Sequence, residues 1–249
     1  MNVPRMLKLR PHPNFRTELI QDSERRNADN IRINIAQLHT RATDFWSGKA
    51  LFEHCLFQDQ KFRRTFERWQ LVAARDCVMS IYHFGRTVES IDISLGYCPS
   101  LRDIIDTTAK RKARKRFEKL FPAYIAVRNA LAHSAERLHT DTNITRHAKK
   151  GPIDLSGMGP ENMAKVFGHA AMAAATGIEV LMGDSIVGNK FISMWEGEVV
   201  TCDIDDASGN RLDEIVEEYW AAFNEVIVPN PTTPAADRAF STDRATDIR

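Results

Sequence analysis

The sequence lacks the paired cysteines and histidines on which metal centres and disulfide frameworks depend. Its four cysteines, at positions 55, 77, 98 and 202, form no CxxC pair. This spacing is typical of reduced thiols and argues against a zinc site. The eight histidines are equally scattered and contain no HExxH or similar ligand pair. We therefore expect no metal ion and no other cofactor.

Long apolar runs are also missing. No stretch approaches the roughly 18 consecutive apolar residues that a membrane span requires. Hydrophobic residues nevertheless make up 43% of the 249 residues, enough for a sizeable core. The N-terminal stretch up to Arg16 contains Pro4, Pro11 and Pro13 but no apolar signal-peptide core. We therefore expect a cytoplasmic protein with no membrane partner.

An excess of positive charge is absent as well, since the formal net charge is only +1. The chain as a whole thus offers no basic surplus to a nucleic-acid partner. Gly157-Met158-Gly159 is followed by no GK[ST] and does not follow a strand pattern, which excludes a phosphate-binding loop of the P-loop type. The sequence also contains no internal repeats.

Helical periodicity is what the chain does have. One apolar stripe predicts a helix over residues 28–47 that ends at Gly48, and residues 51–57 predict a short helix packed on it. A longer stripe predicts a central helix ended by Gly96; its members are Phe62, Phe66, Trp69, Ala73, Cys77, Ile81, Phe84, Val88 and Ile91. Four polar residues lie off this stripe, and we interpret them as a solvent-facing or interhelical face: Arg75, Asp76, His83 and Arg86.

A basic cluster follows. Ser100 and Asp103 match a capping box and predict a helix that uses Leu101, Ile104 and Ile105 as its buried face. This helix runs into six basic residues in seven: Lys110, Arg111, Lys112, Arg114, Lys115 and Arg116. Such a cluster is a natural contact for an RNA phosphate backbone. Between positions 196 and 225, however, ten residues are acidic and one is basic. The cluster is therefore an RNA-binding surface, a solvated helical face, or the partner of the chain's own acidic half.

The segment from Pro122 to Leu138 predicts a further helix with three strong polar groups, Arg128, Asn129 and His133. At about 100° per residue, Asn129 and His133 lie one turn apart, and only the long side chain of Arg128 can reach the same side. Polar groups on an apolar helix need partners, because unpaired burial costs a few kcal/mol for each group. They are either functional, or structural with Arg128 on a buried carboxylate and His133 satisfied in the core.

The string Arg-Asn-x-x-x-His resembles the signature of the HEPN superfamily (higher eukaryotes and prokaryotes nucleotide-binding domains). The resemblance covers the motif and the helices before it, about residues 60–140. It implies a helical bundle and, for many members, a metal-independent ribonuclease that is often a toxin or antiviral effector. It also implies a homodimer that joins two motifs, with Arg128, Asn129 and His133 as the catalytic residues. An antitoxin or other regulatory protein is then a further expected partner.

These residue types suit RNA cleavage. A histidine titrates near pH 6.5 and acts as a base or an acid, while an arginine binds phosphate bidentately and stays charged. Asn129 could orient the imidazole or donate to a phosphate oxygen. One such set is thin for a full reaction, and a two-fold dimer would supply a second. The alternatives are a non-catalytic HEPN module that binds nucleotide, RNA or protein, and an interaction protein in which Arg128 and His133 only hold helices together.

Beyond residue 140 the pattern changes. Residues 141–160 indicate a loop and 160–175 a helix, after which alternating residues predict a three-stranded antiparallel meander at 178–187, 190–195 and 198–204, with a turn at Gly188-Asn189. A last amphipathic helix follows Asn210. The predicted fold is therefore mainly α: an N-terminal extension (1–27), a HEPN-like helical bundle (28–140), a region with the β-meander and final helix packed on the bundle (141–228), and a disordered tail (229–249).

Overall fold

The computed structural model of the protein describes residues 12–56, 62–134 and 184–228, together with positions 140, 142, 143 and 146. This part is mainly helical, with a small antiparallel sheet and a C-terminal helix, which confirms the predicted fold class. The predictions that lie outside the described residues are most of the loop 141–160, the helix 160–175, residues 178–183 of the first strand and the tail 229–249.

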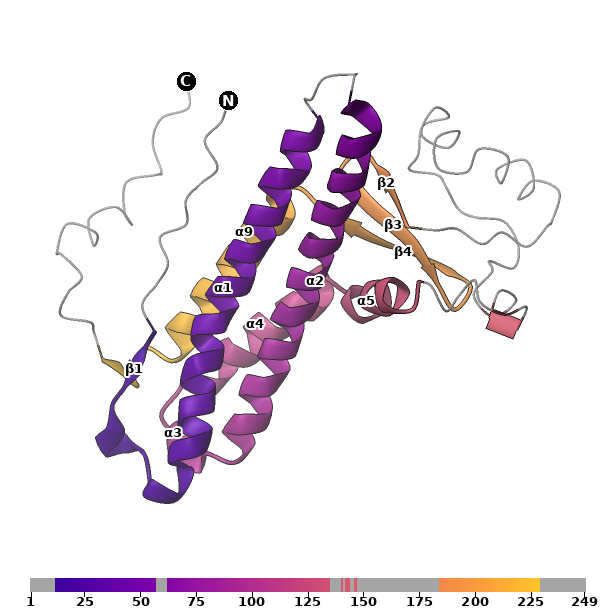
Figure 1. The fold of residues 1–249 in the computed structure, drawn as a ribbon. Coiled ribbons are helices and arrows are strands. Elements are labelled where there is room, and N and C mark those ends of the chain that lie inside the picture. Colours follow the sequence, from indigo (N-terminus) through magenta and orange to yellow (C-terminus); the bar gives the residue numbers. More distant parts are fainter. Residues whose placement is uncertain are drawn as a thin grey trace, which may run out of the picture.

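Two long antiparallel helices, α1 (Arg25–Leu56) and α2 (Arg63–Gly96), form the centre of the fold (Figure 1). The predicted central helix is confirmed by α2, and its apolar stripe is buried from Ala73 onward. The first members of that stripe are not buried, since Phe62 and Trp69 are 52% and 51% exposed. The periodicity therefore gives the correct helix, but the packing partner covers only its later turns.

The prediction that the first helix ends at Gly48 is wrong. The helix α1 continues through Gly48 to Leu56, and the separate short helix predicted over 51–57 is its last part. A Cβ atom at Gly48 would lie 2.9 Å from Sγ of Cys77 on α2. Glycine is needed here because the two helices approach closely, and not because the helix stops.

The single helix predicted to start at Ser100 is in fact two, α3 (Pro99–Arg102) and α4 (Thr107–Leu120). The backbone N–H of Ser100 donates to the buried carboxylate of Glu24 at 3.2 Å, and its hydroxyl donates to the same oxygen. Asp106 supplies the cap of α4 instead, because its carboxylate accepts a hydrogen bond from the N–H of Ala109 at 2.8 Å.

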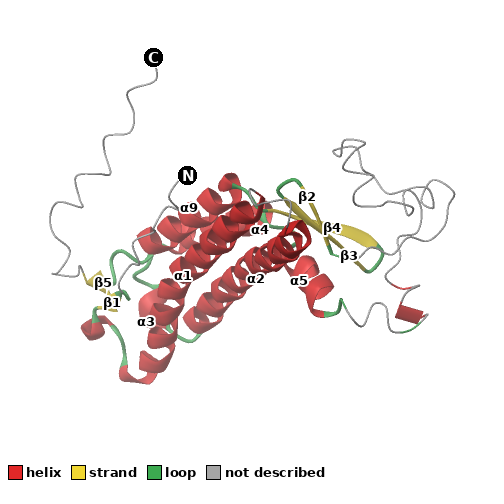
Figure 2. Cartoon of the chain, turned by 45° about the horizontal axis from the view of Figure 1, so that its top comes forward, coloured by secondary structure: helices red, strands yellow, loops and turns green. Residues whose placement is uncertain are grey.

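The predicted meander is confirmed in its described part. Strands β2 (Ser185–Val187), β3 (Lys190–Trp195) and β4 (Glu198–Asp203) pair antiparallel in the order β2-β3-β4. The turn between β2 and β3 has Gly188 in the left-handed region, with φ of 57°. The sheet packs on α2 and α5 (Tyr124–Ala132), at one end of the bundle (Figure 2).

The final helix, α9 (Asp206–Ala222), begins before the predicted start at Asn210, because Asp205 caps it by accepting from the N–H of Ser208 at 2.7 Å. It lies against α1 and α4 (Figure 1). The indole N–H of Trp46 on α1 donates to Asp213 at 3.0 Å. The acidic residues of this region therefore serve in part to attach α9 to the bundle.

The described part of the N-terminal extension is also packed. It contains β1 (Asn14–Phe15) and two short 3-10 helices, η1 (Thr17–Leu19) and η2 (Asp22–Glu24). Strand β1 pairs antiparallel with β5 (Ile227–Val228), and the Phe15 ring stacks on Phe223 with centroids 6.2 Å apart. This two-stranded sheet joins the two ends of the described chain.

Candidate functional site

Helix α5 carries the Arg-Asn-x-x-x-His motif and is shorter than predicted. Pro122 lies in the turn before it, and the helix ends at Ala132, so His133 is its C-cap residue and not a residue within it. Residues 135–139 of the predicted helix lie outside the described residues. The buried side of α5 is formed by Val127 and Ala130, whereas Ile125 is 46% exposed.

A glycine on α2 sets the position of α5. A Cβ atom at Gly85 would lie 2.5 Å from the ring of Tyr124, so the missing side chain leaves the space into which this ring fits. The Tyr124 hydroxyl donates to Glu89 on α2 at 2.7 Å, and burial together with this carboxylate raises the pKa of Tyr124 to about 12. Tyr124 thus holds the first turn of α5 against α2.

Arg128 lies half-buried over an aromatic ring of α2. Its guanidinium carbon is 5.3 Å from the centroid of the Tyr82 ring, a cation–π distance. Its Nη1 donates to Oδ1 of Asn129 at 3.2 Å. Within the described part of the chain, Arg128 forms no ion pair with a carboxylate.

Other partly buried cations of this protein do have carboxylate partners. Lys49 is 4% exposed and binds both Glu53 and Asp206, at 2.5 and 2.8 Å. Arg75 binds the buried Asp184 at 2.8 Å. The structural alternative for Arg128, a buried carboxylate partner, is therefore not what the described residues provide.

His133 faces a different neighbour. Its ring lies 5.4 Å from the ring of Trp195 on β3, and its side chain is partly exposed. Its backbone N–H donates to the carbonyl of Asn129 at 3.0 Å. Asn129 therefore contacts both other motif residues, Arg128 through its side chain and His133 through its backbone, while Arg128 packs on α2 and His133 packs on the sheet.

His83, which the sequence places on a solvent-facing or interhelical face, is a neighbour of this site. It lies next to Tyr82 on α2, its side chain is exposed, and the two rings are 5.3 Å apart. Partial desolvation is the largest cause that lowers the pKa of His83, and the charges of Arg41 and Arg128 lower it further. No local pattern around His83 predicts this, because both cations come from other helices.

The basic cluster divides into two groups. Lys110 and Arg114 bind Asp92 on α2, and Arg116 binds Glu214 and Glu218 on α9. The remaining members are exposed and form no ion pair within the described residues: Arg111, Lys112 and Lys115. The sequence leaves three roles open for the cluster: RNA binding, a solvated helical face, or pairing with the chain's own acidic half. Only Arg116 pairs with that acidic half, whereas Lys110 and Arg114 pair with Asp92 on α2.

A cavity of about 270 Å³ lies beside this cluster. It is lined by Asp92, Leu95, Gly96, Arg102, Thr107, Lys110, Arg111 and Arg114. Four of these side chains are cationic and one is anionic, and two of the cations, Lys110 and Arg114, already pair with that carboxylate, Asp92. The cavity extends the basic surface of α4 to Arg102 of α3.

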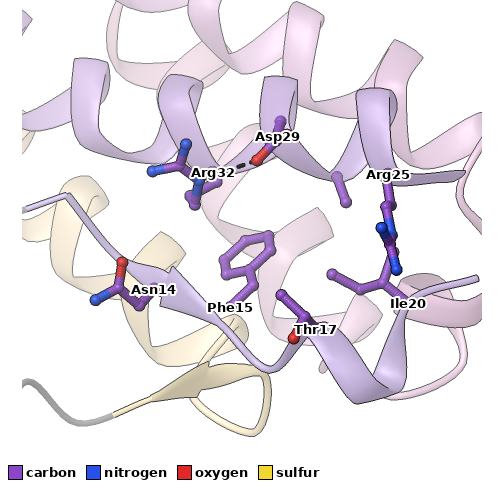
Figure 3. A pocket seen from close by; sticks show the side chains of 8 residues that line it. Asn14, Phe15, Thr17, Ile20, Arg25, Asp29 and Arg32 are labelled. Carbon is purple, nitrogen blue, oxygen red and sulfur yellow. Dashed lines mark hydrogen bonds and ion pairs between the residues drawn. The ribbon is translucent and has the colours of Figure 1, made fainter. Parts of the chain in front are cut away.

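A larger cavity, of about 510 Å³, lies between the N-terminal segment and α1 (Figure 3). Phe15 and Ile20 line its apolar side. Its two cations are already paired, since Arg25 binds Asp22 at 2.7 Å and Arg32 binds Asp29 at 3.3 Å. We assign no ligand to it.

Metal and thiol chemistry find no support in the described residues. No group of three or more His, Cys, Asp or Glu side chains there could hold a metal ion. Burial raises the pKa of Cys98 to about 11 and that of Cys202 to about 12, so both thiols are protonated at neutral pH. None of the described helices has the length and apolar character to cross a membrane.

Within the described residues, the arrangement around α5 therefore offers a guanidinium without a carboxylate partner, an amide beside it, an imidazole at the helix end and a second imidazole on α2. The guanidinium can bind an anion, and each imidazole can transfer a proton. Comparison of the chain with protein-family models, curated proteins and solved structures found no match, so the assignment of a function rests on these residues.

Proposed function

We propose that this protein is a HEPN-like, metal-independent endoribonuclease that acts in the cytoplasm. In this proposal Arg128 binds the scissile phosphate and His133 is the acid–base residue. Asn129 holds the guanidinium in place and contacts the residue that carries the imidazole. The exposed members of the basic cluster bind the RNA backbone on either side.

The observation that carries the proposal is the state of Arg128. Within the described residues, this half-buried guanidinium has an aromatic ring on one face and an amide oxygen at one edge, and no carboxylate there pairs with its donors. Elsewhere in the protein such cations are neutralised, as Lys49 is by Glu53 and Asp206. A phosphodiester is one of the anions, with carboxylates, whose oxygens match the fork of donors on Arg128.

The reaction needs no metal ion. The 2′-hydroxyl loses its proton to a base as its oxygen bonds to phosphorus, and the 5′-oxygen leaves with a proton from an acid. An imidazole can fill either role near neutral pH, and Arg128 stabilises the charge that builds on the phosphate oxygens. The products are a 2′,3′-cyclic phosphate and a free 5′-hydroxyl.

The test is cleavage of single-stranded RNA by the full chain in EDTA. We expect cleavage to proceed at an unchanged rate, to leave 2′,3′-cyclic or 3′-phosphate ends, and to spare DNA of the same sequence, which has no 2′-hydroxyl. Loss of cleavage in EDTA that Mg²⁺ restores would contradict the proposal.

One observation favours a second candidate, a non-catalytic HEPN module that binds RNA or a nucleotide. Arg128 packs on Tyr82 of α2, whereas His133 packs on Trp195 of β3, so the two side chains have different neighbours. A binding module needs only the free guanidinium. It would bind RNA with a steep salt dependence and leave the strand intact.

We further propose a homodimer with α5 near the two-fold axis, because one motif supplies one histidine and two protomers supply two. Ile125, on α5, is 46% exposed and would be covered in such a dimer. Light scattering at tens of micromolar should give twice the 28.3 kDa chain mass, and Ile125→Glu should give monomers. A stable wild-type monomer would count against this arrangement.

The two groups of the basic cluster should respond differently to charge reversal. Replacing Arg111, Lys112 and Lys115 together by Glu removes unpaired cations, so fewer counterions are released on RNA binding. The plot of the logarithm of the RNA-binding constant against the logarithm of the salt concentration has a negative slope. Its magnitude should decrease by about 2, because each lost contact to a single strand contributes roughly 0.7. The control is Arg116→Glu, which breaks ion pairs to α9. This variant should lower the melting temperature clearly but change the salt slope of RNA binding only a little. An unchanged slope in the triple variant would mean that α4 does not bind RNA.

A further inference from the structure

The Tyr82 ring on α2 is shared by two chemically active side chains. On one side the guanidinium carbon of Arg128 lies 5.3 Å from its centroid. On another, the His83 ring lies 5.3 Å away at an interplanar angle of 61°. The Tyr124 ring completes the surroundings at 6.4 Å. Arg128 and His83 therefore each lie beside the same aromatic ring, although they are 45 positions apart in the sequence, and the charge of Arg128 acts on His83.

The charges that face His83 come from two other helices. Arg41 and Asp44 lie on α1 and form an ion pair at 3.0 Å, and Arg128 lies on α5. Nε of Arg41 is buried and has no hydrogen-bond acceptor within the described residues. Two guanidinium groups against one carboxylate leave the surroundings of His83 positive.

This environment keeps the imidazole uncharged. Desolvation and the two arginines lower the pKa of His83 below 6.5, and Asp44 offsets only part of this effect. At neutral pH the ring is therefore a neutral base near a guanidinium that forms no ion pair within the described residues. A base near a positive charge suits a weakly acidic hydroxyl next to a phosphate, because the base takes the proton and the positive charge stabilises the oxyanion that develops.

We propose that His83 and Arg128 together bind one phosphodiester group at the junction of α2 and α5, and that His83 accepts the proton of the attacking 2′-hydroxyl. The binding half stands on the geometry around Tyr82, and the proton-transfer half rests on the proposed ribonuclease function. His133 then serves as the acid: the 2′-hydroxyl proton passes to His83, the bond from the 2′-oxygen to phosphorus forms, the bond to the 5′-oxygen breaks, and His133 protonates that oxygen.

The binding half can be tested without turnover. The titration of the His83 ring is followed by NMR on the full chain, with the signal assigned through His83→Gln. Arg128→Ala should raise the pKa of His83, because a nearby positive charge is removed. The matched control is Arg68→Ala. Arg68 is exposed on α2, the helix that carries His83, and forms no ion pair within the described residues. This variant should leave the pKa unchanged.

The probe is a dinucleotide with a 2′-deoxyribose, which cannot be cleaved by this route. It should raise the pKa of His83 in the wild type and in Arg68→Ala, because a bound anion stabilises the imidazolium, but not in Arg128→Ala. If Arg128→Ala or the dinucleotide leaves the pKa of His83 where it was, the shared site does not exist and the proposal fails.

The proton-transfer half is read from kinetics. His83→Gln keeps a group that can donate to phosphate but cannot take up a proton, so kcat should fall by about 10²-fold or more with little change in KM. The acidic limb of the pH profile of kcat/KM should also be lost. Wild-type rates in His83→Gln would overturn this half. If the dinucleotide shifts His83 while the wild type leaves RNA intact, the ribonuclease proposal fails and the phosphodiester site stands.

Discussion

His133→Ala should lower the rate of RNA cleavage by about 10²–10⁴-fold, the usual size of a lost proton transfer by a placed side chain. Arg128→Ala should cost a comparable factor, about 10²–10³, because the charge that develops on the phosphate loses its counterpart. Asn129→Ala should be milder, since Asn129 is one of two contacts that hold the guanidinium and the contact with Tyr82 remains.

Ser134→Ala is the control for these variants. Ser134 follows His133 directly but has no assigned role, so its replacement should leave kcat unchanged. Thermal melting must be measured beside activity, because His133 also packs on Trp195. If His133→Ala melts many degrees lower and the wild type cleaves no RNA in any buffer, the histidine is structural and the catalytic assignment is wrong.

Phe117→Ala should be the most destabilising single replacement near the site, at about 3–5 kcal/mol. The Phe117 side chain is 1% exposed and contacts three other rings, with centroid distances of 5.3 Å to each of Phe84, Phe121 and Tyr124. It therefore joins α4 to α2 and to the start of α5. Removal of this ring leaves a cavity between α2, α4 and the start of α5, the helix that carries the motif.

The matched control is Phe62→Ala, because Phe62 is the same residue type but is 52% exposed at the N-cap of α2. Unfolding in guanidinium chloride should show a small change in the free energy of unfolding for Phe62→Ala, at an unchanged m-value. Activity should also fall in Phe117→Ala below the unfolding midpoint, since Tyr124 loses its neighbour. Equal costs for the two variants would mean that the aromatic contacts of Phe117 do not stabilise the fold.

The main helices and the β-meander can be predicted from the sequence, whereas several helix ends cannot. The stripe from Ala73 to Ile91 is long and regular, and α2 follows it. Gly48 predicts a helix end because glycine commonly follows the last turn of a helix. In the structure it permits close contact with Cys77 on α2, and a contact between residues so far apart in the sequence leaves no local pattern. Ser100 was misread as a cap for a similar reason, since it binds Glu24, 76 positions earlier.

The site was predictable only in part. The sequence predicts Asn129 and His133 one helical turn apart, with Asn129 orienting the imidazole or donating to a phosphate, whereas in the structure Oδ1 of Asn129 accepts a hydrogen bond from Arg128. The end of α5 at Ala132 was not foreseeable from apolar spacing, and it makes His133 a terminal residue. His83 could not be found from the sequence, because its neighbours Arg41 and Arg128 reach it only after α1, α2 and α5 have packed.

The pairing of β1 with β5 also has a consequence for synthesis on the ribosome. A nascent chain leaves the ribosome N-terminus first, so Phe15 cannot stack on Phe223 and β1 cannot pair with β5 until those residues have left the exit tunnel. Until α9 emerges, the side of α1 that carries Trp46 and Lys49 is likewise uncovered. Contacts of such large sequence separation form late and slowly. Chains released before α9 should therefore aggregate or be degraded, so that only complete chains accumulate.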